Sequence, residues 1–190
     1  MIDLLTKTPA EWADVALSDF PAFLVDHASC ERKASAVGMS FVVRYPDRPL
    51  LIDPMIHFAR EELEHFHQVY RLLHQRGLRL GPDEENVYVN RLIKAVRNGR
   101  DERFLDRLLT TSLLEARGCE RLHLVAEKLE DDDLKQFYAR LARAEARHKD
   151  VFMEIAESYF PKDVVHARLA QLKEVEAEAM ASVPFRSALH

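Results

Sequence analysis

Glycine and cysteine are scarce in this sequence, and it has no long run of apolar residues without a charged residue. Only five glycines occur in 190 residues, and the chain is rich in Leu, Ala, Glu and Arg. This composition, with 47% hydrophobic residues, indicates a helical domain that is large enough to bury a core. The two cysteines, Cys30 and Cys119, lack C-x-x-C spacing, so we expect reduced thiols rather than a disulfide framework or a zinc knuckle.

Charged residues break every apolar stretch within a few positions, so no transmembrane helix is expected. The first residues also lack the basic-then-apolar layout of a secretory signal. We therefore expect a cytoplasmic protein without a membrane partner. The net charge of −5 argues against a general nucleic-acid coat protein.

Helix start and stop signals divide the chain into seven expected helices. Capping patterns at Thr8-Pro9 and Asp53-Pro54, the prolines that follow Tyr45, and the turn residues Gly77 and Asn98-Gly99 set most of the boundaries. The expected helices run over about 9–17, 19–45, 54–77, 87–96, 101–129, 134–159 and 163–182.

Four of these helices are long and are joined by a short, a long and a short connection. This wiring is that of an all-α, ferritin-like four-helix bundle with one long crossover and short flanking helices. No linker separates two domains, so we expect a single domain over 1–190. Its bundle core would span about 19–160, followed by the C-terminal helix at about 163–182.

Two Glu-x-x-His pairs fall on the apolar face of their helices. Glu62 and His65 share a face with Met55, Phe58 and Val69. Glu145 and His148 likewise share a face with apolar residues of the helix near the C-terminal end. Chance alone supplies roughly one Glu-x-x-His pair in a chain of this composition. Two such pairs that both lie on the apolar face of a helix are therefore evidence for a buried site.

Other Glu-x-x-His pairs have the same spacing but fall on polar faces. Glu64 and His67 share a face with His57, Arg60 and other polar residues, and Glu120 and His123 share one mainly with Glu127 and Arg117. We expect Glu64 and His67 to lie at the surface, and we regard Glu120 and His123 as the weaker inward candidates.

Each remaining long helix offers one inward glutamate, Glu31 in the first and Glu115 in the third. Buried carboxylates that converge in one core repel one another, so cations are expected among them. Oxygen-rich sites with one imidazole per metal suit iron or manganese better than structural zinc. The alternative is that these acids pair with arginine inside a non-enzymatic helical interaction module.

The resulting set resembles the ligand motif of the ferritin-like di-iron carboxylate proteins without a missing ligand. Three longer stretches, "FLVDHASCERKASAVGMSFVVRYPDRPLLIDPMIHFAREELEHFHQVY", "LLEARGCERLHLVAE" and "RLARAEARHKDVF", are similar to the family of tRNA hydroxylases that act on 2-methylthio-N6-isopentenyladenosine. The resemblance covers roughly residues 19–160. The ligand set that it implies is Glu31, Glu62, His65, Glu115, Glu145 and His148.

The resemblance implies an O2-dependent monooxygenase with two iron ions. Its substrate would be tRNA that carries a prenylated adenosine next to the anticodon, and the isopentenyl group would be hydroxylated. The resemblance implies no catalytic residue beyond the metal ligands. Electrons would come from an external reductase, because the sequence has no flavin or nicotinamide fingerprint.

The segment 71–107 has an excess of basic residues over acids. It is either a solvated helix surface or a surface that meets phosphates. In the second case Arg97, Arg100 and Arg103 would form a rim that contacts tRNA.

Two other activities are compatible with the same fold, because a fold and its metal site do not determine which reaction a protein catalyses. One is iron oxidation and storage, and the other is a di-iron oxidase or hydroxylase with a different substrate. His27, one turn before Glu31, is compatible with support of a metal ligand and with simple packing.

Overall fold

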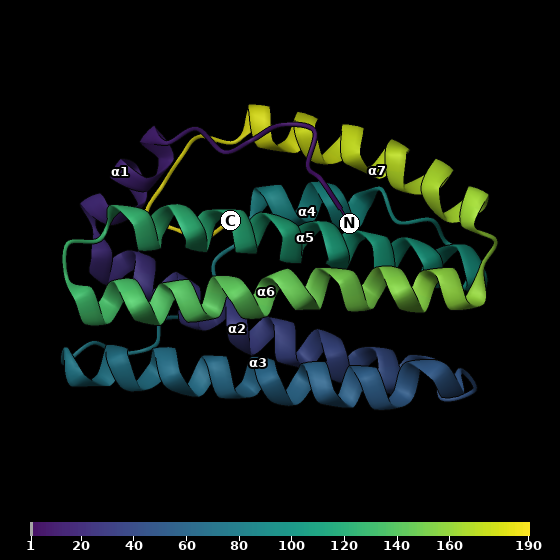
Figure 1. Cartoon of the computed structure of the whole chain (residues 1–190), viewed down its shortest axis with the longest axis horizontal. Coiled ribbons are helices and arrows are strands. Elements are labelled where there is room, and N and C mark those ends of the chain that lie inside the picture. The colour runs from purple at the N-terminus through teal and green to yellow at the C-terminus, as the bar shows by residue number, and fades with distance from the viewer. Residues whose placement is uncertain (1) are drawn as a thin grey trace. The chain divides into compact units, whose positions relative to one another are not determined.

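The computed structural model describes residues 2–190, and within them every regular element is a helix (Figure 1). The seven helices are α1 (Glu11–Ser18), α2 (Phe20–Arg44), α3 (Pro49–Gln75), α4 (Val87–Lys94), α5 (Arg100–Lys128), α6 (Asp132–Tyr159) and α7 (Lys162–Ser182). None of these helices is both long enough and apolar enough to cross a membrane. The helix content predicted from the sequence is confirmed.

The chain forms two compact units, which we describe separately. The α2–α3 unit comprises residues 14–84 and 186–189, and the α5–α6 unit comprises residues 2–13, 85–185 and 190. The boundary at residue 13/14 falls inside α1. The single domain expected from the sequence stays a prediction.

In the α2–α3 unit, two long helices pack side by side along their length (Figure 1). Asp19 caps the start of α2 by accepting a hydrogen bond from the N–H of Ala22 at 3.0 Å. Gly77, with φ of +69°, ends α3 as predicted, because the left-handed backbone lets Leu78 N–H reach the carbonyl of Leu73. The C-terminal segment is tied to α2, where Leu189 N–H donates to Asp26 at 2.7 Å.

Helix α3 begins one turn earlier than the sequence predicted. Its first residue is Pro49, where the missing N–H costs nothing. Pro54, expected at the helix start, lies inside the helix and cannot donate to the carbonyl four residues earlier. The added turn buries Leu51 completely, which contributes about 1.5–3 kcal/mol. That gain offsets the lost hydrogen bond, worth about 1 kcal/mol.

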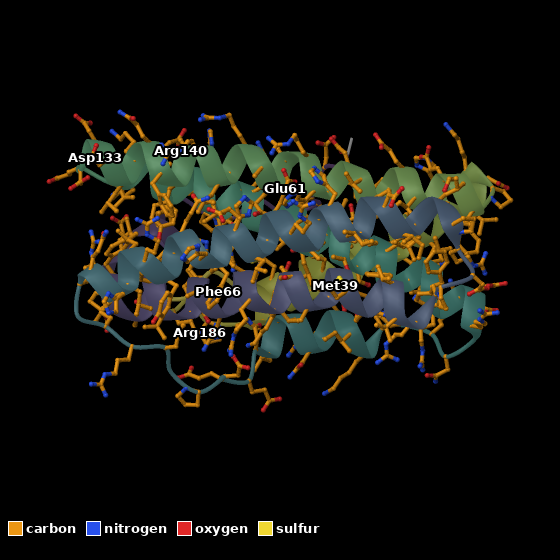
Figure 2. All side chains as sticks on the ribbon, turned by 90° about the horizontal axis from the view of Figure 1, so that it is seen from below. Met39, Glu61, Phe66, Asp133, Arg140 and Arg186 are labelled. Carbon is orange, nitrogen blue, oxygen red and sulfur yellow. The ribbon has the colours of Figure 1, made fainter. Side chains whose placement is uncertain are left out.

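In the α5–α6 unit, α5 and α6 pack side by side, and α7 packs on α4 and α5 (Figure 1). Tyr88 and Leu92 of α4 form a small apolar cluster with Ala179 and Met180 of α7. Side chains such as Asp133 and Arg140 extend from α6 into solvent (Figure 2). Helix α5 is therefore enclosed on several sides by elements of its own unit.

The N-terminal segment also packs on α5 rather than capping α1. The sequence predicted that Thr8 caps a helix from residue 9, but α1 begins at Glu11. The Thr8 hydroxyl instead donates to Glu120 at 2.6 Å and accepts a hydrogen bond from Arg117 at 2.9 Å. A tertiary partner for the hydroxyl replaces the local cap.

Candidate metal centre

Three buried polar side chains meet between α2 and α3, and we call them the α2–α3 triad: Glu31, Glu62 and His65. Nδ1 of His65 lies 3.6 Å from Oε2 of Glu62 and 3.7 Å from Oε2 of Glu31. The helix period brings Glu62 and His65 to the same face of α3 as Met55, Phe58 and Val69, all of which are buried. Two carboxylates and one imidazole thus converge inside one helix pair.

The position of Glu31 is fixed by a neighbour on its own helix. His27, one turn earlier on α2, is fully buried, and its Nε2 lies 2.6 Å from Oε1 of Glu31. This contact occupies one oxygen of Glu31, while the other oxygen points toward His65. Of the two interpretations that the sequence left open for His27, the geometry favours support of Glu31 over simple packing.

A second set, the α5–α6 triad, has the same composition: Glu115, Glu145 and His148. Nδ1 of His148 lies 3.5 Å from Oε2 of Glu145 and 3.9 Å from Oε2 of Glu115. All three side chains are buried. Ser112 joins the two helices one turn before Glu115 by donating to the carbonyl of Lys149 at 2.5 Å. The same three residue types therefore occur once in each unit.

The geometry of each triad fits a metal ion. Two ligand atoms that bind one cation at about 2.1 Å each can be at most about 4.2 Å apart, and every separation above is shorter than that limit. Glu62 with His65, and Glu145 with His148, each offer one carboxylate oxygen and one ring nitrogen as ligands. Oxygen and imidazole donors without thiolate suit iron or manganese.

The competing Glu-x-x-His pairs lie where water reaches them. Glu64 and His67 are exposed on α3, and His123 is exposed on α5. Glu120 is partly buried, but it accepts hydrogen bonds from Thr8 and Arg117 in place of a metal. Periodicity alone therefore separated the inward pairs from the outward ones.

The three arginines of the predicted rim differ in their surroundings. Arg97 donates to both oxygens of Asp106, at 3.0 and 2.7 Å, and this hydrogen bonding raises the pKa of Arg97. Arg103 donates to the side chain of Asn98 at 2.7 Å, and Arg100 is exposed at the start of α5. Arg97 thus holds the connection before α5 in place, and a contact with tRNA stays a prediction for this rim.

Sequence reasoning missed a buried ionic cluster behind the α5–α6 triad. Arg117 of α5 is completely buried, and its Nη2 lies 2.7 Å from Oε1 of Glu176 on α7. The Tyr88 hydroxyl of α4 donates to the same oxygen at 2.6 Å. Burial alone would lower the pKa of Arg117, but the negative charges and hydrogen bonding around it, with Glu176 foremost, together outweigh burial and raise this pKa. The cluster fixes α7 and α4 onto α5 two residues beyond Glu115.

Both cysteines are free thiols, as the sequence predicted. Burial raises the pKa of the Cys30 thiol well above its ordinary value, and it also raises that of Cys119. Cys119 lies 3.3 Å from the carbonyl of Ala142, to which it donates. Neutral, hydrogen-bonded thiols are poor metal ligands and poor nucleophiles, so the triads carry the chemistry of the site.

A hollow opens on α3 beside the α2–α3 triad. Its volume is about 860 Å³, and all the residues that line it belong to α3 between His57 and Gln68. His65 of the triad is part of the wall, together with Phe66. The hollow therefore gives access from the surface of α3 to a candidate metal ligand.

Comparisons with known proteins identify the family of this chain. The sequence profile of the family described as tRNA-(MS[2]IO[6]A)-hydroxylase (MiaE) matches residues 2–190. Two relatives are named tRNA 2-(methylsulfanyl)-N(6)-isopentenyladenosine(37) hydroxylase. The Pseudomonas putida protein is 37% identical over 152 residues, which cover 80% of this chain and 74% of that protein. The Salmonella typhimurium protein is 36% identical over 132 residues, which cover 70% of this chain and 48% of that protein.

A solved structure adds evidence on the fold. Protein 43 with aldehyde deformylating oxygenase activity from Synechococcus matches with a TM-score of 0.95 and 34% sequence identity, over 100% of this chain and 96% of that one. The all-α, ferritin-like fold predicted from the wiring of the helices is thereby confirmed. Since the family profile runs along the whole described chain and two named relatives exceed 35% identity, this chain belongs to the MiaE family of tRNA hydroxylases.

Proposed function

We propose that this chain is an O2-dependent hydroxylase of the isopentenyl group of 2-methylthio-N6-isopentenyladenosine in tRNA, next to the anticodon. The observation that carries the proposal is the family match over residues 2–190 in a chain with two buried Glu-Glu-His triads. The protein would act in the cytoplasm and draw its electrons from a separate reductase.

The six triad residues would hold two iron ions. Glu31, Glu62 and His65 would chiefly hold one ion, and Glu115, Glu145 and His148 the other. Four carboxylates supply the negative charge that two divalent cations require, so this set is electrically balanced in a buried site. The iron pair, when bound, supplies the activation of O2 that inserts one oxygen atom into a C–H bond and releases the other as water.

The residues of the chain supply orientation and exclusion of water. His27 holds one oxygen of Glu31, which leaves the opposite oxygen directed at the centre of the α2–α3 triad. Burial of Glu62 and Glu145 keeps water from competing for the same ligand positions. Because the substrate adenosine belongs to a folded RNA, its base must leave the stack to reach a buried site.

The ligand set is tested by two matched pairs of variants. His65→Ala and His148→Ala each remove a buried triad member, whereas His67→Ala and His123→Ala remove exposed histidines with the same spacing from a glutamate. After reconstitution with iron, we expect the first two variants to lose iron relative to the wild type and the other two to retain it. Equal iron content in all four variants would refute the assignment of the ligands.

The reaction is tested by mass spectrometry of nucleosides. Iron-loaded protein is incubated with prenylated tRNA, a chemical reductant and 18O2, and the tRNA is then digested. We expect a mass increase of one 18O atom on the prenylated adenosine alone. Unchanged nucleosides from an iron-loaded protein would eliminate this substrate while leaving the metal assignment in place.

A second activity is favoured by the structural relative with aldehyde deformylating oxygenase activity. The same triads could serve oxidation of a different substrate, such as an aldehyde that loses its carbonyl carbon as formate. Incubation of the same preparation with a fatty aldehyde distinguishes the two. Formate release without tRNA oxidation would replace the proposed substrate by an aldehyde.

A further inference from the structure

The last turns of α3 and the first residues after it, over residues 66–81, carry basic residues without acidic ones. Between His65 and Pro82 the sequence has no aspartate or glutamate. We define the α3 basic patch as the exposed residues His67, Arg71, His74, Arg76 and Arg79. In a chain with a net charge of −5, such a patch is the electrostatic feature that attracts a polyanion.

Two arginines of the patch are available to a partner. Within the described chain, Arg71 and Arg79 are exposed and make no hydrogen bond or ion pair with another side chain. Arg76, by contrast, lies over the ring of Phe20 at 5.7 Å and donates to the carbonyl of Leu72. Arg97 of the predicted rim is likewise occupied, by Asp106. Unoccupied guanidinium groups are the ones that can take up phosphates without breaking a structural contact.

Aromatic rings run through the same part of α3. The ring centroids of Phe66 and Tyr70 are 6.0 Å apart, and those of Tyr70 and His74 are 6.2 Å apart. Tyr70 is 38% exposed, so its ring can be covered by a planar ligand. Figure 2 shows Phe66 leaving α3 on a different side from Glu61, which lies five residues earlier. Aromatic rings beside arginines are the surface on which unpaired bases stack.

The hollow on α3 adjoins this surface and has one residue of the α2–α3 triad in its wall. Phe66, His67 and Gln68 belong both to its wall and to the start of the basic and aromatic region, and His65 lies in the same wall. A base displaced from an RNA loop that stacks on Tyr70 would thus lie beside an opening that reaches a triad residue. A docking surface and an entrance occur on the same helix.

We propose that the α3 basic patch and the Phe66–Tyr70–His74 rings bind the single-stranded anticodon loop of the substrate RNA and direct the modified base into the hollow at His65. Arg71 and Arg79 contact loop phosphates, and Tyr70 stacks on an unpaired base. The choice of RNA as the partner rests on the proposed function.

The test measures binding of a fluorescently labelled anticodon stem–loop RNA to the full chain. Arg71→Glu/Arg79→Glu is compared with Lys7→Glu/Arg44→Glu, which changes the net charge equally at exposed positions outside the patch. We expect the patch variant to bind at least about tenfold more weakly and the control to bind as the wild type does. Two lost phosphate contacts should also reduce the slope of log affinity against log salt by about 1.4.

Further variants separate stacking from charge and from misfolding. Tyr70→Ala should weaken binding about fivefold or more, whereas Tyr70→Phe should not, because the ring is kept. Arg71→Gln/Arg79→Gln removes the charges without reversing them and should show the same loss in smaller degree. The wild type should prefer the stem–loop to a fully paired RNA of the same length.

Failure of this proposal is distinguishable from failure of the proposed function. Unchanged RNA affinity of Arg71→Glu/Arg79→Glu, or a loss confined to Arg100→Glu/Arg103→Glu, would overturn the α3 surface even if tRNA is hydroxylated. Conversely, RNA binding that depends on the patch, in a protein that does not oxidise the RNA, would retain the surface and reject the reaction.

Discussion

The two helix pairs carry the same triad but differ in what surrounds them. Helix α5 is enclosed by α4, α6, α7 and the N-terminal segment of its own unit, and most of its length is buried. Helix α3 packs on α2 within its own unit, and it carries exposed histidines and arginines. We propose that the two units have different roles, in which the α5–α6 unit supplies rigidity and the α3 surface serves recognition.

A further difference concerns the residue that lies one turn before the first glutamate of each triad. His27 contacts Glu31 on α2, but the corresponding position on α5 is Thr111. The Thr111 hydroxyl donates to the carbonyl of Arg107 on its own helix, at 2.8 Å. His27 therefore contacts Glu31, whereas the hydroxyl at the corresponding position of α5 is bonded to its own helix.

The largest effect is expected from Arg117→Leu, which leaves Glu176 buried without its cation. Loss of one member of a buried ion pair typically costs about 3–5 kcal/mol, and urea unfolding should show a decrease of that size. Substitution of both residues, Arg117→Leu with Glu176→Leu, should restore part of it. Equal stability of wild type and single variant would contradict the rigid role assigned to the α5–α6 unit.

The two mid-helix glycines should respond in opposite directions. A Cβ at Gly38 of α2 would lie 2.8 Å from Cδ1 of Phe58 and 3.0 Å from Cβ of Ala59. Gly38→Ala should therefore separate α2 from α3 at a cost of about 1–3 kcal/mol. At Gly118 of α5 the nearest contact would be 3.9 Å away, so Gly118→Ala should stabilise by up to about 1 kcal/mol through helix propensity.

Urea unfolding of both glycine variants, with circular dichroism as the signal, checks this contrast. The iron content of Gly38→Ala should also fall, because the α2–α3 triad spans the two helices that are pushed apart. A stabilised Gly38→Ala protein would show that the approach of α2 to α3 is not constrained there.

The difference between His27 and Thr111 predicts unequal responses of the two triads. His27→Ala should weaken iron binding about 10–100-fold, the range found for residues that orient a metal ligand. His27→Gln, which keeps a side-chain donor, should recover part of the affinity, and Thr111→Val should have little effect. Iron titration monitored by absorbance measures the iron affinity of all three variants. Equal losses of affinity in His27→Ala and Thr111→Val would contradict the proposed difference between the two triads.

The smallest effect concerns acid stability. Burial would raise the pKa of Asp106, but its hydrogen bonds from Arg97 and Arg168 outweigh burial and lower it. The stabilisation from Asp106 is therefore present above the ordinary pKa of 3.8 and is lost as the pH falls through the lower pKa of the folded state. Urea midpoints measured from pH 7 down to pH 2 should decrease more steeply in the wild type than in Asp106→Asn. Parallel curves would contradict this assignment.

The sequence alone determined the helices and which glutamates and histidines point inward. Period and capping are local properties, so the positions of Glu62, His65, Glu145 and His148 on buried faces followed from spacing. The same reasoning placed Glu64 and His67 at the surface and ranked Glu120 and His123 as the weaker inward candidates. The start of α3 was predicted wrongly because burial of Leu51, a tertiary contact, outweighs the local preference against a proline inside a helix.

Only the tertiary structure decided which partner each polar side chain has. The pairing of Arg117 with Glu176 joins residues that are 59 positions apart, and no local pattern encodes it. The same holds for Arg97, whose charge suggested RNA contact but whose guanidinium is held by Asp106. A helix period determines the direction of a side chain, whereas its partner depends on which other segment packs against that face.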